Sequence, residues 1–242
     1  MSQVLESHHE DGVCRIVLNR PEKMNALSAD LVEALIEAVD AAHEQGCEVL
    51  AFEGQGRNFS AGFDFGGYET QSEGDLVLRF VRLETLLQKV ATSPALTLAC
   101  AHGKNFGAGV DLFGACRLRV AAPDATFRMP GLKFGLVLGT RRFAAVVGQA
   151  SAHDVLMHTR TFGAEQGQAM GFVTRQCEAS GWDAVRRAAR QSARELPGAT
   201  RRHLHAVLGS SEQHDADLAD LVRSAAAPGL KQRIAAYLTP KT

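Results

Sequence analysis

Short apolar runs of strand length alternate with stretches of helical periodicity in the first part of this chain, and the last part is helical throughout. Val13 to Leu18 has the composition of a strand and ends at Asn19-Arg20-Pro21, because proline cannot donate a hydrogen bond to a central strand. The same reasoning predicts further strands at residues 49–52, 95–101, 118–121 and 126–129. This order indicates an α/β fold that is completed by a C-terminal helical region.

Helical periodicity is clearest after Ser28, which can cap the start of a helix. Leu31, Leu35 and Val39 recur at helical spacing behind it, and Gly46 closes the segment. Further helices are expected at residues 76–90, 107–116, 141–147 and 152–157. The chain from 182 to 238 is expected to be helical, with breaks at the two Pro-Gly pairs at 197–198 and 228–229.

The charge and cysteine patterns narrow the class of protein. The 26 Lys and Arg balance the 27 Asp and Glu, so no field of one sign would recruit nucleic acid or a membrane. The five cysteines form no C-x-x-C pair and the histidines show no ligand spacing, so we expect no metal. The N-terminus lacks the apolar stretch of a signal peptide, and no run of about 18 apolar residues occurs. We therefore expect a cytoplasmic location.

Two glycine-lined segments stand out, because each places small residues where a strand gives way to a turn or a helix. The first runs from Phe59 to Asp64 and the second from Gly103 to Asp111. Glycine permits a positive φ and lets a ligand approach the main chain. In the second segment, the first N–H groups of the following helix have no intrahelical partner and would point outward as donors. Taken alone, a segment of this kind more often serves close packing than chemistry.

Together, the two segments supply the backbone N–H groups of Phe63 and Ala108 as candidates for stabilising a negatively charged oxygen. A thioester carbonyl that becomes an enolate needs two donors that converge on one oxygen. Asp111 follows Ala108 by three residues, so its carboxylate would rise on the same helical face and could act on a substrate. An aspartate in a first helical turn is also favoured simply by the helix dipole.

The combined pattern resembles the crotonase, or enoyl-CoA hydratase/isomerase, superfamily. The resemblance covers nearly everything from Ile16 to Val173, and it rests on residues 18–28, 59–64, 103–111, 116–121 with 125–127, and 164–166 with 171–173. It implies a crotonase-like spiral of ββα units in residues 1–195. It also implies a C-terminal helical oligomerisation region in residues 196–242, and a homotrimer or homohexamer.

The resemblance further implies that coenzyme A is part of the substrate, with no permanently bound cofactor, and that it lies between the two glycine segments. The loop after the first apolar run would supply basic side chains for the CoA phosphates and main chain for the adenine edge. The positions implied to contact CoA are Arg20, Lys23, Ala26, Leu27, Ala61 and Gly107. For the two basic residues, a solvated turn is an equally good explanation.

The sequence departs from the family's hydratases at two positions. These enzymes carry a pair of glutamates, because water addition needs two carboxyl groups to orient the water and to exchange its proton. The first position holds Asp111 here, whose side chain is shorter by one C–C bond, about 1.5 Å. The second holds Gly131. The loop at residues 135–142 is also about three residues shorter than the family's pattern, so we expect a different acyl pocket.

These features predict an acyl-CoA-processing enzyme of the lyase or isomerase type, in fatty acid metabolism, that stabilises a thioester enolate or oxyanion. The alternatives are an acyl-CoA decarboxylase, a thioester hydrolase and a non-catalytic protein that binds CoA esters. A hydrolase triad could be drawn from Ser60, His102 and Asp111, although Ser60 does not lie in a G-x-S-x-G elbow.

Overall fold

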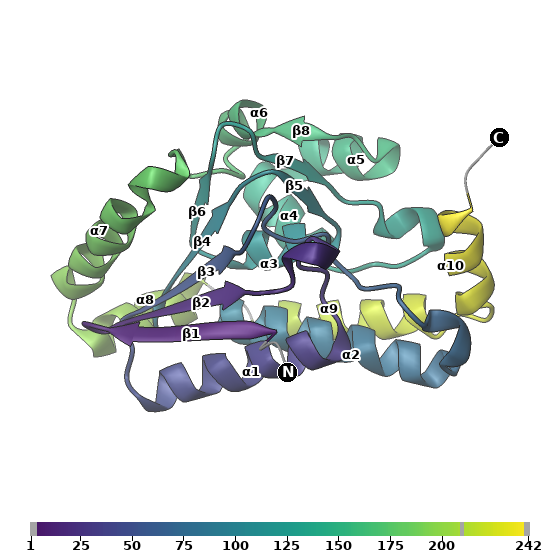
Figure 1. Ribbon diagram of the computed structural model, residues 1–242, viewed down its shortest axis with the longest axis horizontal. Helices are drawn as coiled ribbons and strands as arrows, with labels where there is room; N and C mark the ends of the chain where they lie inside the picture. The colour runs from purple at the N-terminus through teal and green to yellow at the C-terminus, as the bar shows by residue number, and fades with distance from the viewer. Residues whose placement is uncertain (1–3, 209–210, 240–242) are drawn as a thin grey trace.

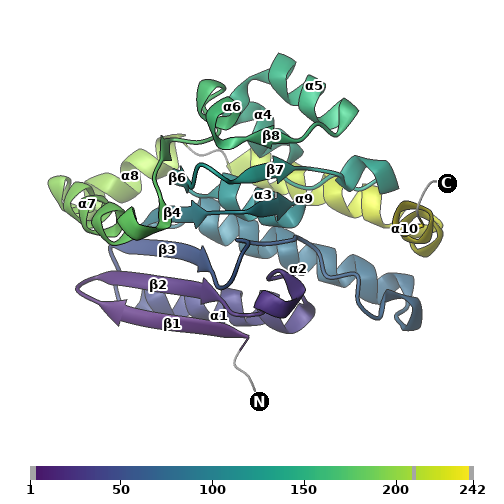
Figure 2. The same cartoon turned by 45° about the horizontal axis from the view of Figure 1, so that its top comes forward.

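A six-stranded sheet lies at the centre of the fold, with strand order β1-β2-β3-β4-β6-β9. Figure 2 shows its strands from β1 to β6 in this order. The computed structural model describes residues 4–208 and 211–239. β1 and β2 form an antiparallel hairpin, and the other neighbours pair in parallel. The strands are β1 (Leu5–Glu10), β2 (Val13–Leu18), β3 (Val49–Gly54), β4 (Leu96–Ala101), β6 (Leu118–Ala121) and β9 (Arg175–Gln176). The predicted α/β class is confirmed.

The first strand, β1, was not predicted from the sequence, because its residues contain no apolar run. Leu5 is its only buried residue, and most of the others are exposed at the edge of the sheet. The turn to β2 is made by Asp11 and Gly12, whose φ angles are 55° and 78°. An Asp-Gly pair with positive φ at both residues is typical of the tight hairpin turn whose twist matches that of the strands.

A second, smaller sheet holds the start of the second glycine segment. It consists of β5 (Lys104–Phe106), β7 (Thr126–Arg128) and β8 (Phe162–Gly163), in the order β5-β7-β8. The sequence predicted β7 only, because strands of two or three residues are too short to show a period. β5 pairs in parallel with β7 and leads directly to Gly107, the N-cap of helix α3 (Ala108–Ala115).

The two long helices begin at capping serines. In α1 (Ala29–Glu44), the Ser28 hydroxyl accepts from the amide of Leu31 at 3.3 Å, as the sequence predicted. α2 (Glu73–Ala91) begins three residues before its predicted start at 76. Ser72 and Asp75 form a reciprocal cap there, in which each side chain accepts from the other residue's amide at 3.0 Å. Such a capping box satisfies two amides that a helix would otherwise leave free.

The central sheet is buried on both faces because its strands alternate their side chains. Leu50 and Phe52 of β3 pack into the main core beside α1 and α2, whereas Val49 and Ala51 point to the opposite face. Helix α7 (Trp182–Glu195) covers that opposite face, where Trp182 lies against the strands. In Figure 1, α1 and α2 lie below the strands and α7 lies on the other side of them, at the left.

The C-terminal helices pack back onto their own chain. They are α8 (Gly198–Leu208), α9 (Ser211–Ala225) and α10 (Leu230–Leu238). α9 lies along α2 and contributes Leu221 to the main core, and α10 contributes Leu230 and Ile234 beside the short helix η3 (Gly131–Phe134). The boundary at 195/196 and the oligomerising role of the last segment stay predictions.

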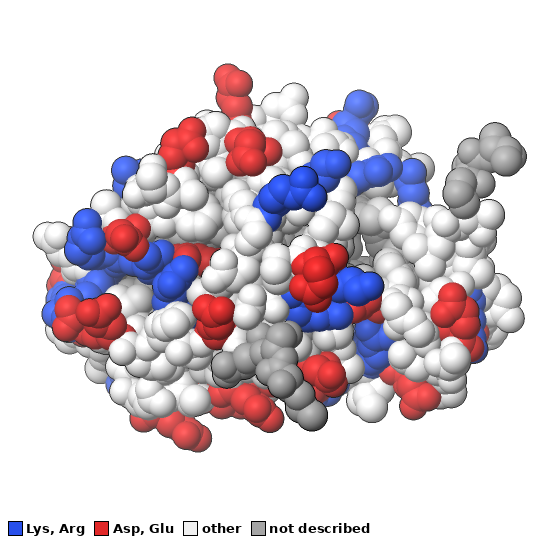
Figure 3. Space-filling model, viewed as in Figure 1, with Lys and Arg blue, Asp and Glu red and all other residues white. Residues whose placement is uncertain are grey.

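The remaining helices connect the smaller sheet to these layers. They are α4 (Thr140–Val147), α5 (Gln149–His158) and α6 (Ala164–Ala169), with the short helices η1 (Pro21–Lys23), η2 (Tyr68–Thr70) and η4 (Ala179–Gly181). None of the helices in the described ranges is both long and apolar enough to cross a membrane. Figure 3 shows acidic and basic side chains interspersed over one face, in line with the balanced composition.

Candidate functional site

A cavity of about 460 Å³ lies between the two glycine segments and helix α10. Its walls are mostly apolar, as is usual for sites that bind small molecules and cofactors. The lining comes from the loop after β2, the first glycine segment, the start of α3, the η3 loop and the end of α10. The lining residues are Glu22, Lys23, Met24, Ala26, Ala61, Phe63, Asp64, Phe65, Phe80, Phe106, Gly107, Ala108, Asp111, Met129, Pro130, Gly131, Leu132, Phe134, Leu136, Leu138, Thr140, Leu156, Tyr237 and Leu238.

The two glycine segments meet main chain to main chain at one end of this cavity. Gly62 has a φ of 80°, and a Cβ added to it would lie 2.3 Å from the Phe106 carbonyl oxygen and 3.0 Å from the Ala108 nitrogen. Gly109 packs just as tightly on Ser60, with a Cβ position only 2.6 Å from its carbonyl oxygen. Both glycines are therefore required by close approach, and the packing explanation holds alongside any ligand role.

The amides of Phe63 and Ala108 are left free by this arrangement. The amides of Leu27 and Asp64 bond across to Gly62 and Leu27 oxygens at 2.7 and 3.2 Å, so the amide of Phe63 between them points the other way. Ala108 is the first residue of α3, where an amide has no intrahelical partner. Within residues 4–208 and 211–239, neither amide donates to a protein acceptor. Both residues line the cavity.

Asp111 brings one carboxyl group to the cavity from the first turn of α3. Its side chain is buried, and its Oδ1 has no hydrogen-bond partner among the described residues. The main chain of Gly139 packs directly on this carboxyl group, since a Cβ added to Gly139 would lie 1.9 Å from Oδ1. Burial raises the pKa of the Asp111 carboxyl well above its ordinary value, the positive charge of Arg142 opposes this, and Glu84 adds to it. The carboxyl group therefore keeps its proton to higher pH than an exposed aspartate.

Among the residues that the structure describes, the cavity wall holds no second carboxyl group that is both buried and unpaired. Gly131 lines the cavity, at the position where the family's hydratases have their second glutamate. The other acidic residues in the cavity wall are Asp64, which accepts from Arg20 at 2.8 Å, and Glu22, which is exposed to solvent. The site therefore offers one buried acid.

Four of the six residues implied to contact CoA lie in the cavity wall: Lys23, Ala26, Ala61 and Gly107. Leu27 is almost completely buried and does not reach the cavity. The Arg20 guanidinium donates to the Ala26 carbonyl oxygen at 2.5 Å and pairs with Asp64, so it braces the loop. The structure thus brings Ala26, Ala61 and Gly107 together in the cavity wall, whereas the Arg20 side chain points into its own loop.

Sequence reasoning did not identify the aromatic wall of the cavity. Phe65, Phe134 and Tyr237 form a cluster with ring centroids 5.1 to 6.1 Å apart. Tyr237 comes from α10, more than a hundred residues from the other two in the sequence. An aromatic residue near the end of an amphipathic helix was the only available signal, and by itself it indicates packing as readily as binding.

The hydrolase triad drawn from the sequence is wrong. The Ser60 hydroxyl is buried and donates to the Asn25 carbonyl oxygen at 2.9 Å. The His102 ring makes other contacts: Nε2 lies 2.9 Å from the Gly56 carbonyl oxygen, and the ring centroid lies 5.5 Å from that of Trp182. The described residues contain no group of three or more His, Cys, Asp or Glu side chains that could hold a metal ion.

The chain was compared with protein families and with curated relatives. Residues 8–227 match the sequence model of the enoyl-CoA hydratase/isomerase family. The "Probable enoyl-CoA hydratase echA6" of Mycobacterium tuberculosis is 35% identical over 158 residues, which cover 64% of this chain and 63% of that protein. The "Hydroxycinnamoyl-CoA hydratase-lyase" of Pseudomonas fluorescens is 30% identical over 175 residues, covering 68% of this chain and 63% of that protein. The chain thus spans less than two thirds of the length of these relatives.

Solved structures agree over the full length of the chain. The crystal structure of a Bordetella parapertussis protein, titled as an enoyl-CoA hydratase/isomerase, superposes on this chain with a TM-score of 0.97. The two sequences are 56% identical. The match covers 99% of this chain and 100% of that one. The enoyl-CoA hydratase from Bacillus halodurans has a TM-score of 0.84 at 21% identity, over 97% of this chain and 100% of that one, and it supports the fold alone.

Proposed function

The chain belongs to the crotonase, or enoyl-CoA hydratase/isomerase, superfamily, and we propose that it processes an acyl-coenzyme A thioester through an enolate. The single observation that carries this proposal is the pair of free amides, of Phe63 and Ala108, at one end of a largely apolar cavity. Negative charge that develops on the thioester oxygen would be shared between them. In a dry, preorganised site, one such donor contributes roughly 3 kcal/mol to the transition state.

Asp111 is the group that would exchange a proton with the acyl chain. In a one-base isomerisation, its carboxylate removes a proton from the carbon beside the thioester carbonyl, and the C–H electron pair becomes the enolate. The resulting carboxylic acid returns the proton to the far end of the conjugated system, so the double bond moves and Asp111 ends as it began. One carboxyl group is enough for this step, and the site has one.

Water addition is not proposed. It would need a second carboxyl group to orient and deprotonate the water while the first serves the α-carbon. Gly131 in the cavity wall has no side chain to do so.

Decarboxylation of a malonyl-type thioester is a second candidate, favoured by the burial of Asp111. Loss of CO₂ leaves the electron pair of the broken C–C bond in the enolate, and no base is needed. A carboxylic acid must then protonate the α-carbon, and the raised pKa of Asp111 favours its protonated form. Solvent would restore the proton to Asp111 after each turnover.

The remaining expectations stand as proposals. Coenzyme A would enter as part of the substrate, with the exposed Lys23 at the mouth of the cavity suited to a phosphate group. A cytoplasmic homotrimer or homohexamer stays the proposed state.

Mass spectrometry on a panel of crotonyl-, dienoyl-, malonyl- and hydroxyacyl-CoA esters tests the proposal. An isomer of unchanged mass, detected by chromatographic shift, would identify isomerisation, and a loss of CO₂ would identify decarboxylation. Asp111→Asn should abolish either product while CoA-ester binding, measured by calorimetry, stays within about threefold of wild type. Failure to bind any ester would overturn the proposal. A product heavier than its substrate by one water would show that the enzyme catalyses hydration after all.

A further inference from the structure

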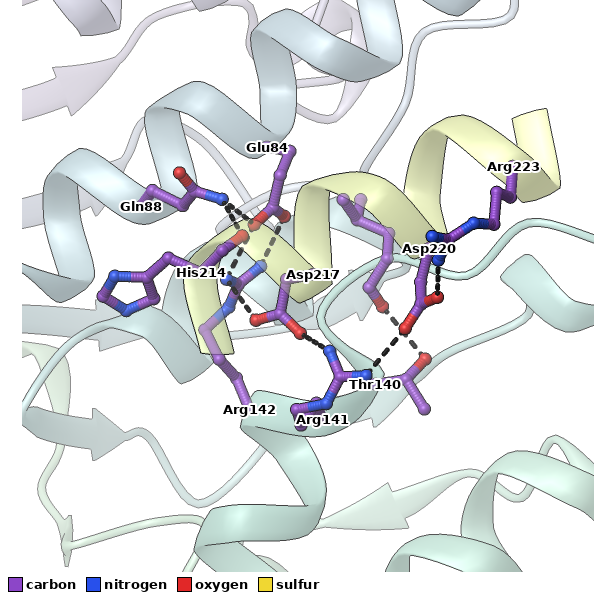
Figure 4. Close-up of polar contacts among 10 residues, drawn as sticks. Glu84, Gln88, Thr140, Arg141, Arg142, His214, Asp217, Asp220 and Arg223 are labelled. Carbon is purple, nitrogen blue, oxygen red and sulfur yellow. Dashed lines mark hydrogen bonds and ion pairs between the residues drawn. The ribbon is translucent and has the colours of Figure 1, made fainter. Parts of the chain in front are cut away.

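A buried ion-pair network joins three helices behind the candidate site (Figure 4). The guanidinium of Arg142, on α4, donates to both carboxylate oxygens of Glu84, on α2, at 2.8 and 2.5 Å. It also donates to Asp217, on α9, at 3.1 Å. Gln88 completes the shell of Glu84 by donating to Oε1 at 2.9 Å. The Glu84 side chain is 1% exposed and that of Arg142 is 14% exposed, so both charges are held in place out of water.

This network lies next to Asp111. The main chain of Gly139 touches the Asp111 carboxyl group, and Arg142 follows Gly139 by three residues in the first turn of α4. The charges of Arg142 and Glu84 act on Asp111 with opposite signs. Two buried atoms of opposite polarity lack a partner among the described residues here: Oδ1 of Asp111 and Nε of Arg142.

The other charged groups of the network and of the cavity wall are paired or exposed to solvent. α2 and α4 are the helices that pack on α3, and they present Glu84 and Arg142. Asp217 lies behind Arg142 and bonds to it. At the opposite wall of the cavity, Asp64 is paired with Arg20. Glu22 and Lys23, at the mouth, are exposed to solvent.

We propose that Arg142 and Glu84 are positioning residues for Asp111: Glu84 holds the guanidinium beside the carboxyl group and keeps it from forming a direct ion pair. The proposal rests on the proposed function, because it assigns proton exchange to Asp111. A direct pair with Arg142 would occupy the free oxygen and fix Asp111 as a carboxylate. Without Arg142, burial would fix it as an acid. The held guanidinium allows the carboxyl group to move between the two forms.

The network makes two substitutions act in opposite directions on the same group. Arg142→Gln removes the positive charge and should raise the pKa of Asp111. Glu84→Gln removes the negative charge and frees Arg142 to approach the carboxyl group, so it should lower the pKa. A charge within about 4–6 Å of a carboxyl group shifts its pKa by about one unit or more.

Arg141→Gln is the matched control. Arg141 neighbours Arg142 on α4 and carries the same charge, and it also pairs with Asp217. Its side chain is 41% exposed and bonds to Asp220 at 2.6 Å, at the surface. Arg141→Gln also removes one positive charge and its ion pairs from α4, but Arg141 is not one of the charges that act on Asp111. We expect the Asp111 midpoint to stay within about 0.3 units of wild type, because water screens an exposed charge.

The test is an infrared titration of the Asp111 carboxyl band, obtained as the difference between each protein and its Asp111→Asn counterpart. We expect the midpoint pH of this band to rise in Arg142→Gln, to fall in Glu84→Gln and to stay unchanged in Arg141→Gln. Arg142→Lys, which retains the charge, should restore a midpoint near wild type. If Arg142→Gln does not fold, the comparison of Arg142→Lys with Glu84→Gln still decides the matter.

Shifts of equal sign in the two network variants, or no shift in Glu84→Gln, would overturn the positioning role. A shift in Arg141→Gln as large as that in Arg142→Gln would do the same. The infrared readout needs no turnover. A chain that fails the CoA-ester panel but passes this titration would therefore refute the proposed function alone, and the reverse result would refute only the network's role.

Discussion

Substitution of Gly62 by alanine should damage both the fold and the candidate oxyanion site. Gly62 has a φ of 80°, and an alanine in this left-handed region costs about 1 kcal/mol. The new methyl group would also lie 2.3 Å from the Phe106 oxygen and 3.0 Å from the Ala108 nitrogen. Both are main-chain atoms, so the second glycine segment must shift, and overpacking of this kind costs a further 1–3 kcal/mol or so. We expect a total destabilisation of about 3 kcal/mol.

Gly67→Ala separates the two contributions. Gly67 has a φ of 70° and no atom within 4 Å of the position of a Cβ, so it meets the conformational cost without the clash. We expect a loss of about 1 kcal/mol in Gly67→Ala and unchanged turnover. In Gly62→Ala the amide of Ala108 is displaced, and the loss of one oxyanion donor should lower kcat about 100-fold.

Urea unfolding gives the stabilities, followed by the fluorescence of Trp182, the single tryptophan, which is buried between α7 and the sheet. Turnover is measured on the CoA ester that the panel identifies. If Gly62→Ala is no less stable than Gly67→Ala and turns over as fast, the two segments do not meet as described and the shared-oxyanion argument fails.

Three further outcomes are expected. Because burial raises the folded-state pKa of Asp111, the stability that its protonated form provides is present at and below pH 3.8 and is lost as the pH rises through the folded pKa. Asp111→Asn should therefore gain stability relative to wild type as the pH rises, and urea unfolding should show the gain vanish on acidification. Burial raises the pKa of the Cys14 thiol to about 11 and that of Cys116 to about 12, so mass spectrometry should find both unmodified by iodoacetamide at about pH 8 until urea is added; rapid native labelling would contradict their burial. Tyr237→Ala should weaken CoA-ester binding about tenfold by calorimetry with kcat nearly unchanged, whereas an unaltered affinity would remove α10 from the binding wall.

The sequence located the long elements because burial imposes a period on them. β2 and β6 begin and end where the sequence predicted strands, at Val13–Leu18 and Leu118–Ala121. α1 follows its capping serine. β1 and β8 escaped detection, since an edge strand that is mostly exposed or a two-residue strand needs no apolar pattern.

The candidate site divides in the same way. Phe63, Ala108 and Asp111 could be singled out because glycine segments and a first helical turn have local signatures. The inward turn of Arg20 and the placing of Tyr237 could not, because each depends on a partner distant in the sequence: Asp64 for the first and Phe134 for the second.

By itself, the sequence determined the α/β class, the two glycine segments and the position of Asp111, since these depend on residue type and local spacing, and its motifs carried the resemblance to the superfamily. The tertiary structure alone decided that the two segments touch and that Asp111 is desolvated. It also decided that Glu84 and Arg142 stand behind Asp111. The physical reason is that burial, close approach and charge coupling are properties of pairs of residues brought together by folding, and no single stretch of chain records its partner.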